Sequence, residues 1–383
     1  MKSSKVKAEV PSPTDGTFAE IAELIASAKA RAFQAVNTAL IDVYWQVGAI
    51  ISRKIEAAEW GEGVVPKLAG YLARTQPGLR GFTRPNLFRM RQFYEAWRDH
   101  ALVPAAPAQS RSSARRDGRT AIVSAVPRQL TSEAGERGGG EIVAALLRQL
   151  PWTHHMMIIG QCKIPEEREF YLRLAVREHW SSRELERQLK GALFERTVLS
   201  PPRASSAVAR SHAGALAVFK DAYLVEFLDL PRGHAEHDLH RGLLLKLRDF
   251  LGELGRDFCF VGTEFPIQVG GRDFALDLLF FHRGLNCLVA IELKVGRFEP
   301  EYLGKLGFYL EALDRDVRKP HEQPAIGVLL CASKEEEVVE YALNRTLSPA
   351  LIAEYRTRLP DKTLLQAKLH EFYRQNAPDG DDA

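Results

Sequence analysis

The residues best suited to chemistry are Asp277, Glu292 and Lys294, which interrupt two otherwise apolar, strand-like runs. A Gly-Leu dipeptide at 284–285 lies midway between these runs and suits the two-residue turn of a β-hairpin. With that turn, Asp277 lies directly opposite Glu292, and opposed side chains have Cβ atoms about 4.5–5.5 Å apart. Side chains alternate along a strand, so Lys294 shares the face of Glu292. The spacing therefore predicts two carboxylates and an ammonium group on one face.

Two carboxylates that face each other repel, so this arrangement needs compensating positive charge. Lys294 supplies part of it, and a divalent cation between Asp277 and Glu292 would supply more. Ligands that are all oxygen favour Mg²⁺ or Mn²⁺ over zinc. Such an ion can activate a water and stabilise charge that develops on a phosphate, while the lysine orients the nucleophile. The pattern is typical of a metal-dependent phosphodiesterase; the alternative is an ordinary surface hairpin with a cross-strand ion pair.

Periodicity in the C-terminal part predicts the elements that would position these residues. A helix at 236–254 precedes three strand-like runs, and a Gly-Gly dipeptide separates the first two as another hairpin turn. A helix, a buried-type strand, a second helix, a strand and a last helix follow. The order αβββαβ, with an α-rich tail, predicts a mixed α/β sheet. The predicted strands are 258–269, 272–281, 287–295, 325–331 and 351–355, and the two helices between the later strands span about 300–313 and 335–343.

The first 200 residues differ from the rest in charge and in pattern. They hold 29 basic and 21 acidic side chains, or +8, whereas residues 201–383 hold 23 basic and 28 acidic ones, or −5. Their apolar residues recur at helical spacing, which predicts an all-helical module ahead of the sheet domain. The expected organisation is a disordered arm at 1–16, a helical domain for nucleic acid or a partner at 17–200 with a flexible insertion at 104–140, a linker at 201–215, a sheet domain at 216–376 and a tail at 377–383.

Length and composition are those of a globular protein with two or three domains. Of the 383 residues, 45% are hydrophobic and 26% are charged, which excludes wholesale disorder. No apolar stretch reaches the roughly 18 residues that a membrane span requires, and no apolar segment follows the basic start to form a secretory signal. The four cysteines (Cys162, Cys259, Cys287 and Cys331) lack paired spacing, which argues against a structural zinc site. We therefore expect a protein of the reducing cytoplasm.

Several segments resemble one known family of bacterial proteins. The segment FALDLLFFHRGLNCLVAIELKVGRFEPEYLGKLGFYLEALD is similar to the catalytic core of the PD-(D/E)XK nuclease superfamily, and more narrowly to the YhcG-like family. The resemblance extends into the N-terminal half through VNTALIDVYWQVGAII, GFTRPNLFRMRQFYEAW, LPWTHHMMI and EREFYLRLAVREHWSSRELERQL. It implies a restriction-endonuclease-like fold for residues 216–376, beside the helical N-terminal domain that is characteristic of the family.

The resemblance also implies a role for each residue of the hairpin. Asp277 would be the first metal ligand, Glu292 the second, and Lys294 the catalytic lysine, with Mg²⁺ or Mn²⁺ as cofactor. In the following helix, Lys305 and Tyr309 lie four residues apart on one face, where related nucleases often carry Gln and Tyr facing the site. The alternative for this second pair is a solvated helix face.

The predicted first helix departs from the superfamily pattern. Related nucleases often place a Glu there that supports the metal, but His240 stands near that position, and Glu236 or Glu253 could substitute for the missing acid. His234, His237 and His240 at three-residue spacing could also bind a metal. The start of a polar helix is the preferred interpretation, because no acidic or cysteine partner has matching spacing.

The helix expected after Thr83 carries Arg84, Arg91 and Arg98, seven residues apart and on one stripe. A short helix and a turn precede it, which fits a helix-turn-helix or winged-helix arrangement. The arginines could contact phosphates, and those of the insertion could add non-specific attraction. The alternative is a solvated face on which Arg91 pairs with Glu95. The arginines of the insertion considered for this role are Arg111, Arg115, Arg116 and Arg119.

The sequence thus predicts a metal-dependent nuclease that acts on nucleic acid, with DNA as the expected substrate. The N-terminal module could also bind a second copy of the chain or another protein. Two alternatives stay open: a non-catalytic nucleic-acid-binding or regulatory protein that keeps the nuclease fold as a scaffold, and a component of a defence or toxin-like system. The complete set of Asp277, Glu292 and Lys294 favours the enzyme, whereas the unassigned fourth acid favours the scaffold.

Overall fold

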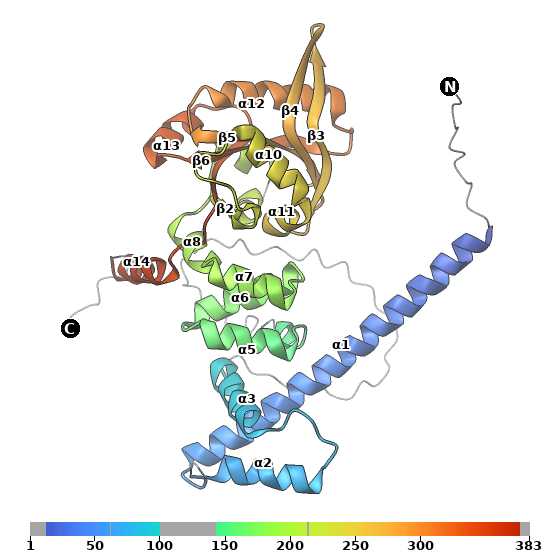
Figure 1. The fold of residues 1–383 in the computed structure, drawn as a ribbon, viewed down its shortest axis with the longest axis vertical. Helices are drawn as coiled ribbons and strands as arrows, with labels where there is room; N and C mark the ends of the chain where they lie inside the picture. Colours follow the sequence, from blue (N-terminus) through green and yellow to red (C-terminus); the bar gives the residue numbers. More distant parts are fainter. Residues whose placement is uncertain (1–12, 62, 100–142, 213, 376–383) are drawn as a thin grey trace. The chain divides into compact units, whose positions relative to one another are not determined.

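The computed structural model of the chain describes residues 13–61, 63–99, 143–212 and 214–375 (Figure 1). The predicted insertion with its arginines, the tail and residues 1–12 of the predicted arm lie outside these ranges. The chain divides into two compact units, whose boundary in the sequence lies between Val176 and Arg177. Within the described residues, no helix is both long and apolar enough to cross a membrane.

The N-terminal unit consists of helices, as the apolar spacing predicts. Helix α1 begins at Pro13, inside the predicted arm, and its C-terminal half packs against α3. Gly48 permits this close approach, because a Cβ there would lie 2.1 Å from the carbonyl oxygen of Met90. The core includes Tyr44, Ile51, Val65, Leu87 and Met90. The helices are α1 (Pro13–Glu56), α2 (Val64–Thr75), α3 (Arg84–Trp97), α5 (Trp152–Gln161) and α6 (Pro165–Arg177).

The C-terminal unit, as far as it is described, is built on a seven-stranded mixed sheet with strand order β1-β7-β6-β5-β4-β3 and with β2 beside β7. Strands β3, β4 and β5 pair antiparallel, and β6 runs parallel to β5 and β7. The predicted mixed α/β fold is therefore confirmed. The strands are β1 (Arg203–Ala204), β2 (Ala222–Leu224), β3 (Phe258–Val269), β4 (Arg272–His282), β5 (Cys287–Arg297), β6 (Gln323–Ser333) and β7 (Ala350–Arg356).

From residue 216 on, the helices of this unit agree with the predicted ones except in the first, which breaks at Lys246 into two shorter helices. Helix α9 forms inside the segment predicted as a linker. A short π-helical turn extends α12 from Leu313 to Val317. The helices are α7 (Ser182–Lys190), α8 (Leu193–Leu199), α9 (Ser206–Ser211), α10 (Glu236–Leu245), α11 (Leu247–Leu254), α12 (Tyr302–Ala312), α13 (Glu336–Asn344) and α14 (Lys362–Gln375), with 3₁₀ turns at Ala215–Ala217 and Glu226–Leu228.

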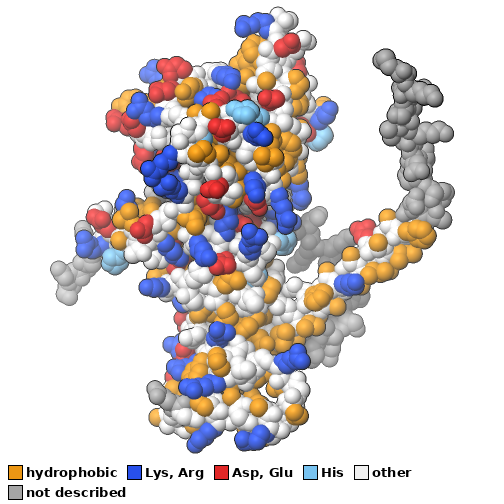
Figure 2. Space-filling model, in the orientation of Figure 1, with side chains coloured by type: hydrophobic (Ala, Val, Ile, Leu, Met, Phe, Trp, Pro, Cys, Tyr) orange, Lys and Arg blue, Asp and Glu red, His pale blue; other side chains and the backbone are white. Residues whose placement is uncertain are grey.

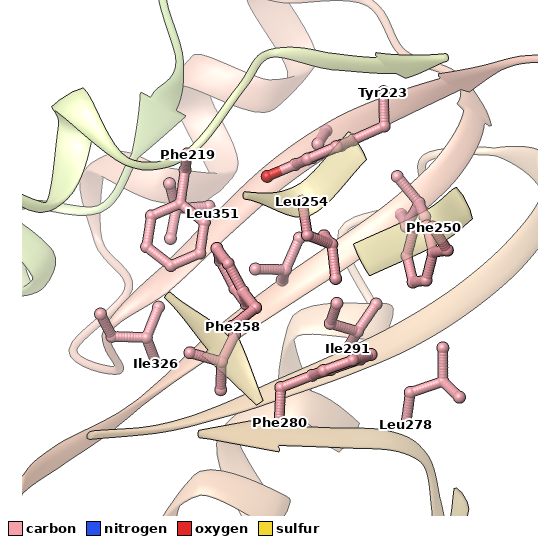
Figure 3. Packing of buried hydrophobic residues seen from close by; sticks show 14 of the residues in the cluster. Phe219, Tyr223, Phe250, Leu254, Phe258, Leu278, Phe280, Ile291, Ile326 and Leu351 are labelled. Carbon is pink, nitrogen blue, oxygen red and sulfur yellow. The ribbon is translucent and has the colours of Figure 1, made fainter. Parts of the chain in front are cut away.

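Apolar cores lie on both faces of the sheet. On one face, the rings of Phe250 and Phe258 approach Phe280 at centroid distances of 6.1 and 6.3 Å (Figure 3). On the other face, α12 and α13 pack against the strands. Because α12 covers the second face, residues 287–293 of β5 are buried without interruption, and Glu292 is among them.

Residues 201–215 are part of the folded unit rather than a linker. Strand β1 pairs antiparallel with β7, and the Ser205 hydroxyl donates to the Ser348 carbonyl oxygen at 2.7 Å. The composition of this segment suggested a linker, but its Ser205 hydroxyl satisfies backbone groups of both Ser348 and Ala350 beside β7. Helices α7 and α8, which precede this segment, also belong by contact to the C-terminal unit. The Arg196 side chain of α8, for example, donates to the Ala222 carbonyl oxygen of β2 at 2.8 Å.

Candidate active site

The hairpin of β4 and β5 has the predicted register. Leu278 lies opposite Ile291, so the same register brings Asp277 opposite Glu292. The connecting loop spans residues 283–286 rather than two residues. The pairing is unchanged because both loops are centred on the same dipeptide.

Glu292 is fully buried and is held by two lysines. Its Oε1 accepts hydrogen bonds from the ammonium groups of Lys305 and Lys294, the latter at 3.3 Å. Its Oε2 is buried, and no donor among the described residues reaches it. Burial, and then the negative charge of Asp277, raise the pKa of Glu292 above its ordinary value. The site therefore holds a carboxyl group whose charge is incompletely compensated.

Lys294 stands between the acids of the site. Its Nζ lies 3.3 Å from Glu292 Oε1 and 3.2 Å from Glu236 Oε1, and it donates to the Leu293 carbonyl oxygen at 2.7 Å. Burial disfavours the charged form of this lysine, but the carboxylates of Glu292 and Glu236 outweigh burial and raise its pKa. Lys294 is therefore a cation throughout the neutral pH range.

The backbone of Asp277 is held by side chains where the β-ladder is interrupted. Opposite it, Glu264 of β3 has a φ of 44°, and the pairing of β3 with β4 skips this position. Thr263 Oγ1 donates to the Asp277 carbonyl oxygen at 3.2 Å, and His240 Nε2 lies 2.7 Å from the same hydroxyl. His240 Nε2 also lies 3.3 Å from the Asp277 carbonyl oxygen, so Thr263 and His240 meet at the same backbone oxygen. The carboxylate itself is fixed by the Leu293 N–H, which donates to Asp277 Oδ2 at 2.8 Å.

Of the two acids considered as substitutes in the first helix, one lies in the site and the other does not. Glu236, at the start of α10, contacts Lys294. Glu253 is buried in α11, where Arg187 Nη1 and Lys220 Nζ lie 2.8 and 3.0 Å from its carboxylate oxygens. Glu253 therefore belongs to a separate, buried charge cluster.

The three histidines of the first helix region do not converge on a common point. His234 contacts β7, His237 is exposed, and His240 contacts β3. Among the residues that the structure describes, no group of three or more His, Cys, Asp or Glu side chains is arranged to hold a metal ion. Asp277 and Glu292 are the two side chains here whose oxygens could hold a divalent cation together with water, backbone oxygen or phosphate.

Helix α12 carries Lys305 and Tyr309 on the face that covers this site. Lys305 contacts Glu292, and its Nζ lies 5.3 Å from the centre of the Tyr309 ring. The Tyr309 hydroxyl donates to the Ala275 carbonyl oxygen at 2.9 Å and so ties α12 to β4. Tyr309 is only 2% exposed, whereas the Lys305 side chain is 49% exposed. The alternative of a solvated helix face was therefore wrong for Tyr309.

The predicted arginine stripe of α3 is largely engaged in ion pairs. Arg91 Nε donates to Glu95 Oε1 at 2.6 Å, the pair that the alternative interpretation expected. Arg98 Nη1 donates to Glu56 Oε1 at 2.9 Å, and Arg84 is exposed. Two of the three arginines would therefore have to exchange a carboxylate for a phosphate in order to bind nucleic acid.

The same unit contains two basic residues that sequence reasoning missed. Arg89 and Arg168 line a groove of about 690 Å³ together with apolar residues of α5. Arg168 Nε is buried, and no acceptor within the described ranges reaches it. These arginines come from α3 and α6, so no sequence spacing links them.

The helix-turn-helix expected around α3 is not matched by the connection between α2 and α3. This connection, residues 76–83, is longer than the three or four residues of a helix-turn-helix turn.

Comparison with known proteins gives matches across both units. The family described as "YhcG PDDEXK nuclease domain" matches residues 216–370, and the family described as "DUF1016 N-terminal domain" matches residues 20–111 and 136–196. A curated protein of Escherichia coli K12, "Putative nuclease YhcG", is 30% identical over 93% of this chain and 95% of its own length.

Two solved structures align with part of the chain. A repair endonuclease from Pyrococcus abyssi is 16% identical over 34% of this chain and 50% of that protein, with a TM-score of 0.23. The apo structure of EndoMS is 17% identical over 34% of this chain and 49% of that protein, with a TM-score of 0.22. The alignments thus span about half the length of each of these two proteins.

Proposed function

Because the chain belongs to the YhcG family, whose C-terminal part is a PDDEXK nuclease domain, we propose that it is a divalent-metal-dependent nuclease that hydrolyses phosphodiester bonds in DNA. The observation that carries the proposal is the buried Oε2 of Glu292, which has no donor among the described residues and belongs to the residue opposite Asp277. A buried carboxylate oxygen without a partner is unfavourable, and a cation is the group that would satisfy it.

The residues of the site fit such an ion. Asp277 and Glu292 would hold Mg²⁺, or Mn²⁺ in its place, because both supply oxygen ligands. When bound, the ion would stabilise charge that develops on the phosphate. Lys294 is cationic at neutral pH and would hold the attacking water and a phosphate oxygen by hydrogen bonds. Glu236 would keep the Lys294 ammonium in place through their ion pair.

Helix α12 would contribute Lys305, which contacts the phosphate, and Tyr309, which holds Lys305 in position. Lys305 is half exposed and would donate to a phosphate oxygen when Glu292 is neutralised by the ion. Tyr309 would act as a positioning residue, because its hydroxyl is already donated to Ala275 and its ring lies beside Lys305.

We also place the protein in the cytoplasm. Its four cysteines are free, and three of them are buried. Burial raises the pKa of the Cys287 and Cys331 thiols to about 12, so these thiols are unreactive. Free cysteines of this kind suit a reducing compartment.

The direct test is a cleavage assay with the purified full-length chain. Supercoiled plasmid, single-stranded DNA and RNA are each incubated with Mg²⁺, with Mn²⁺ or with a chelator. We expect metal-dependent cleavage of DNA and none with the chelator. Binding without cleavage of any substrate would favour the scaffold alternative, and cleavage of RNA alone would move the proposed substrate from DNA to RNA.

The Thr263 hydroxyl should be needed to position Asp277. Replacing it in Thr263→Val keeps the shape of the side chain but removes its hydrogen bonds to Asp277 and His240. We expect cleavage to fall about 10- to 100-fold, the usual loss when a group that orients a metal ligand is removed. The measurement is the rate of plasmid cleavage as a function of Mg²⁺ concentration.

A matched variant separates this positioning role from a general loss of structure. Thr263→Ser keeps the hydroxyl and should restore most of the activity, although it loses a methyl group. Equal activity of the valine variant and the unmodified protein would show that the hydroxyl does not position Asp277.

The arginines of α3 should contribute to DNA binding through phosphate contacts. We propose that Arg84, Arg91 and Arg98 face the DNA backbone, so Arg84→Ala/Arg91→Ala should weaken binding. The slope of log affinity against log salt concentration should fall by about 1 to 2, as expected for one or two lost phosphate contacts. Fluorescence anisotropy with a labelled duplex at several salt concentrations measures both effects.

The control removes the same charge from a neighbouring helix. Lys67→Ala/Arg74→Ala on α2 should leave the salt slope close to that of the unmodified chain. If the α3 and α2 variants behave alike, α3 has no special part in binding.

A further inference from the structure

Helix α1 carries large apolar side chains that remain exposed to solvent. Every residue from 17 to 36 is exposed, and Figure 2 shows hydrophobic side chains along this helix. Nine large apolar side chains of α1 are between 42% and 76% exposed. They are Phe18, Ile21, Leu24, Ile25, Phe33, Val36, Leu40, Val43 and Ile50.

These side chains form one continuous stripe, which we call the α1 stripe. At 100° per residue, all except Leu24 fall within an arc of about 120°. The face that packs on α3, through Tyr44 and Gly48, is rotated roughly 100° from the centre of that arc. The α1 stripe runs along α1 from Phe18 to Ile50 and is separate from the core of the N-terminal unit along most of this length; near its C-terminal end, Val47 and Ile51 lie on the same side of α1 and pack into that core.

The spacing within the stripe is that of a helix–helix seam. Residues 18, 21 and 25, and again 36, 40 and 43, follow one another at intervals of three and four, as apolar residues do in coiled coils. The stripe spans nearly five heptads, or about 50 Å, which exceeds the three to four heptads that a coiled coil requires. Lys29 lies inside the stripe, and a single polar residue in a seam fixes the register of the partner.

The area of the stripe matches what a homodimer needs. The eight side chains within the arc are about half exposed and offer roughly 250–500 Å² of apolar surface per copy, at about 60–120 Å² for each buried side chain. Two copies would then bury about 500–1,000 Å² of apolar surface, comparable with the apolar share of a standard interface. A second copy also presents the same stripe, so the contact is self-complementary about a two-fold axis.

We propose that the α1 stripe is a self-association surface through which two copies of this chain form a dimer. Most of the stability of a helix in a protein comes from packing of its apolar face, and pairing would bury the exposed apolar face of α1. The dimer does not depend on the proposed nuclease activity. If the dimer proposal fails, the active-site proposal is unaffected.

The test is the mass of the full-length protein in solution. Light scattering after size-exclusion chromatography should give twice the chain mass of 42.9 kDa for the unmodified protein. Ile25→Glu/Val36→Glu places charge at the centre of the stripe and should give the monomer mass at the same concentration. Ser27→Glu/Ala30→Glu places the same charge on the opposite side of α1 and should leave the dimer intact.

Circular dichroism and the thermal midpoint of the C-terminal unit check that both variants are folded. A monomeric unmodified protein would overturn the proposal and mean that something other than a second copy covers the stripe. A dimer that survives Ile25→Glu/Val36→Glu would also overturn it, because the contact would then lie elsewhere.

Discussion

Replacing Lys294 with methionine should reduce metal-dependent cleavage at least 10²- to 10³-fold, the loss expected when a charge-stabilising group is removed from a catalytic site. The ammonium lies 3.3 Å from Glu292 and 3.2 Å from Glu236, so it is the cation shared by two acids of the site. Methionine keeps most of the side-chain volume and packs in the same space. Plasmid cleavage in Mg²⁺, followed over several orders of magnitude in enzyme concentration, measures the loss.

A lysine outside the site provides the matched control. Lys368→Met changes an exposed residue of α14 and should cleave like the unmodified chain. Both variants should have similar circular dichroism spectra. A Lys294→Met variant that retains cleavage within threefold of the unmodified protein would remove Lys294 from the catalytic site.

The second large effect concerns the stability of the C-terminal unit. Glu253→Gln should lower its free energy of unfolding by about 3–5 kcal/mol at pH 7, because it leaves buried cations without their counter-charge. Glu253 is fully buried; its carboxylate contacts Arg187 and Lys220 and accepts from the Leu224 N–H at 3.1 Å. The cluster links α7, α11 and β2. Calorimetric unfolding of the full-length chain measures the loss.

The pH dependence of this effect has a definite sign. Burial alone would raise the pKa of Glu253, but the positive charges of Lys220, Arg187 and Arg196 outweigh burial and lower it to about 2. A folded-state pKa below the ordinary value of 4.5 means that the stabilisation is complete above about pH 4.5 and is lost as the pH falls toward 2. The stability difference between the unmodified protein and Glu253→Gln should therefore be constant from pH 5 to 7 and shrink at lower pH.

An exposed acid of the same region serves as the control for Glu253. Glu186→Gln removes the partner of Lys190 on the surface of α7 and should change stability little, because exposed ion pairs contribute little. Equal effects of the two substitutions at pH 7, or a Glu253 effect that grows on acidification, would contradict the role of the buried cluster.

The hairpin could be predicted because residues close together in the sequence determine its strands and its turn. The dipeptide at 284–285 fixes the register, and the register alone brings Asp277 opposite Glu292. The apolar runs on either side fix the strands. These inferences need no contact between residues that are distant in the sequence, which is why they agree with the structure.

What sequence reasoning missed depends on contacts between distant segments. The burial of Glu292 requires α12 to lie on its face, and the support of Asp277 joins Thr263 and His240 across 23 residues. The cluster around Glu253 joins α7 to α11. No local pattern marks these contacts, and the Gly-Gly turn alone places Glu264, rather than Thr263, opposite Asp277. The segment 201–215 was misread because Pro and Ser suit both linkers and sheet-edge caps.

We propose that Glu292 is kept buried to bind a metal rather than to stabilise the fold. Because burial and Asp277 raise its pKa, its charged form is disfavoured in the folded protein without metal. Glu292→Gln should therefore raise the thermal midpoint in a chelator at neutral pH. This gain should disappear as the pH falls below about 4.5, where the unmodified Glu292 is also neutral in both states.

The most direct measurement pairs that thermal midpoint with plasmid cleavage in Mg²⁺ on the same preparation of Glu292→Gln. We predict a higher midpoint in the chelator together with the loss of cleavage, the combination expected of a residue that trades stability for function. Cleavage equal to that of the unmodified chain, or a lower midpoint in the chelator, would contradict the assignment of Glu292 as a metal ligand.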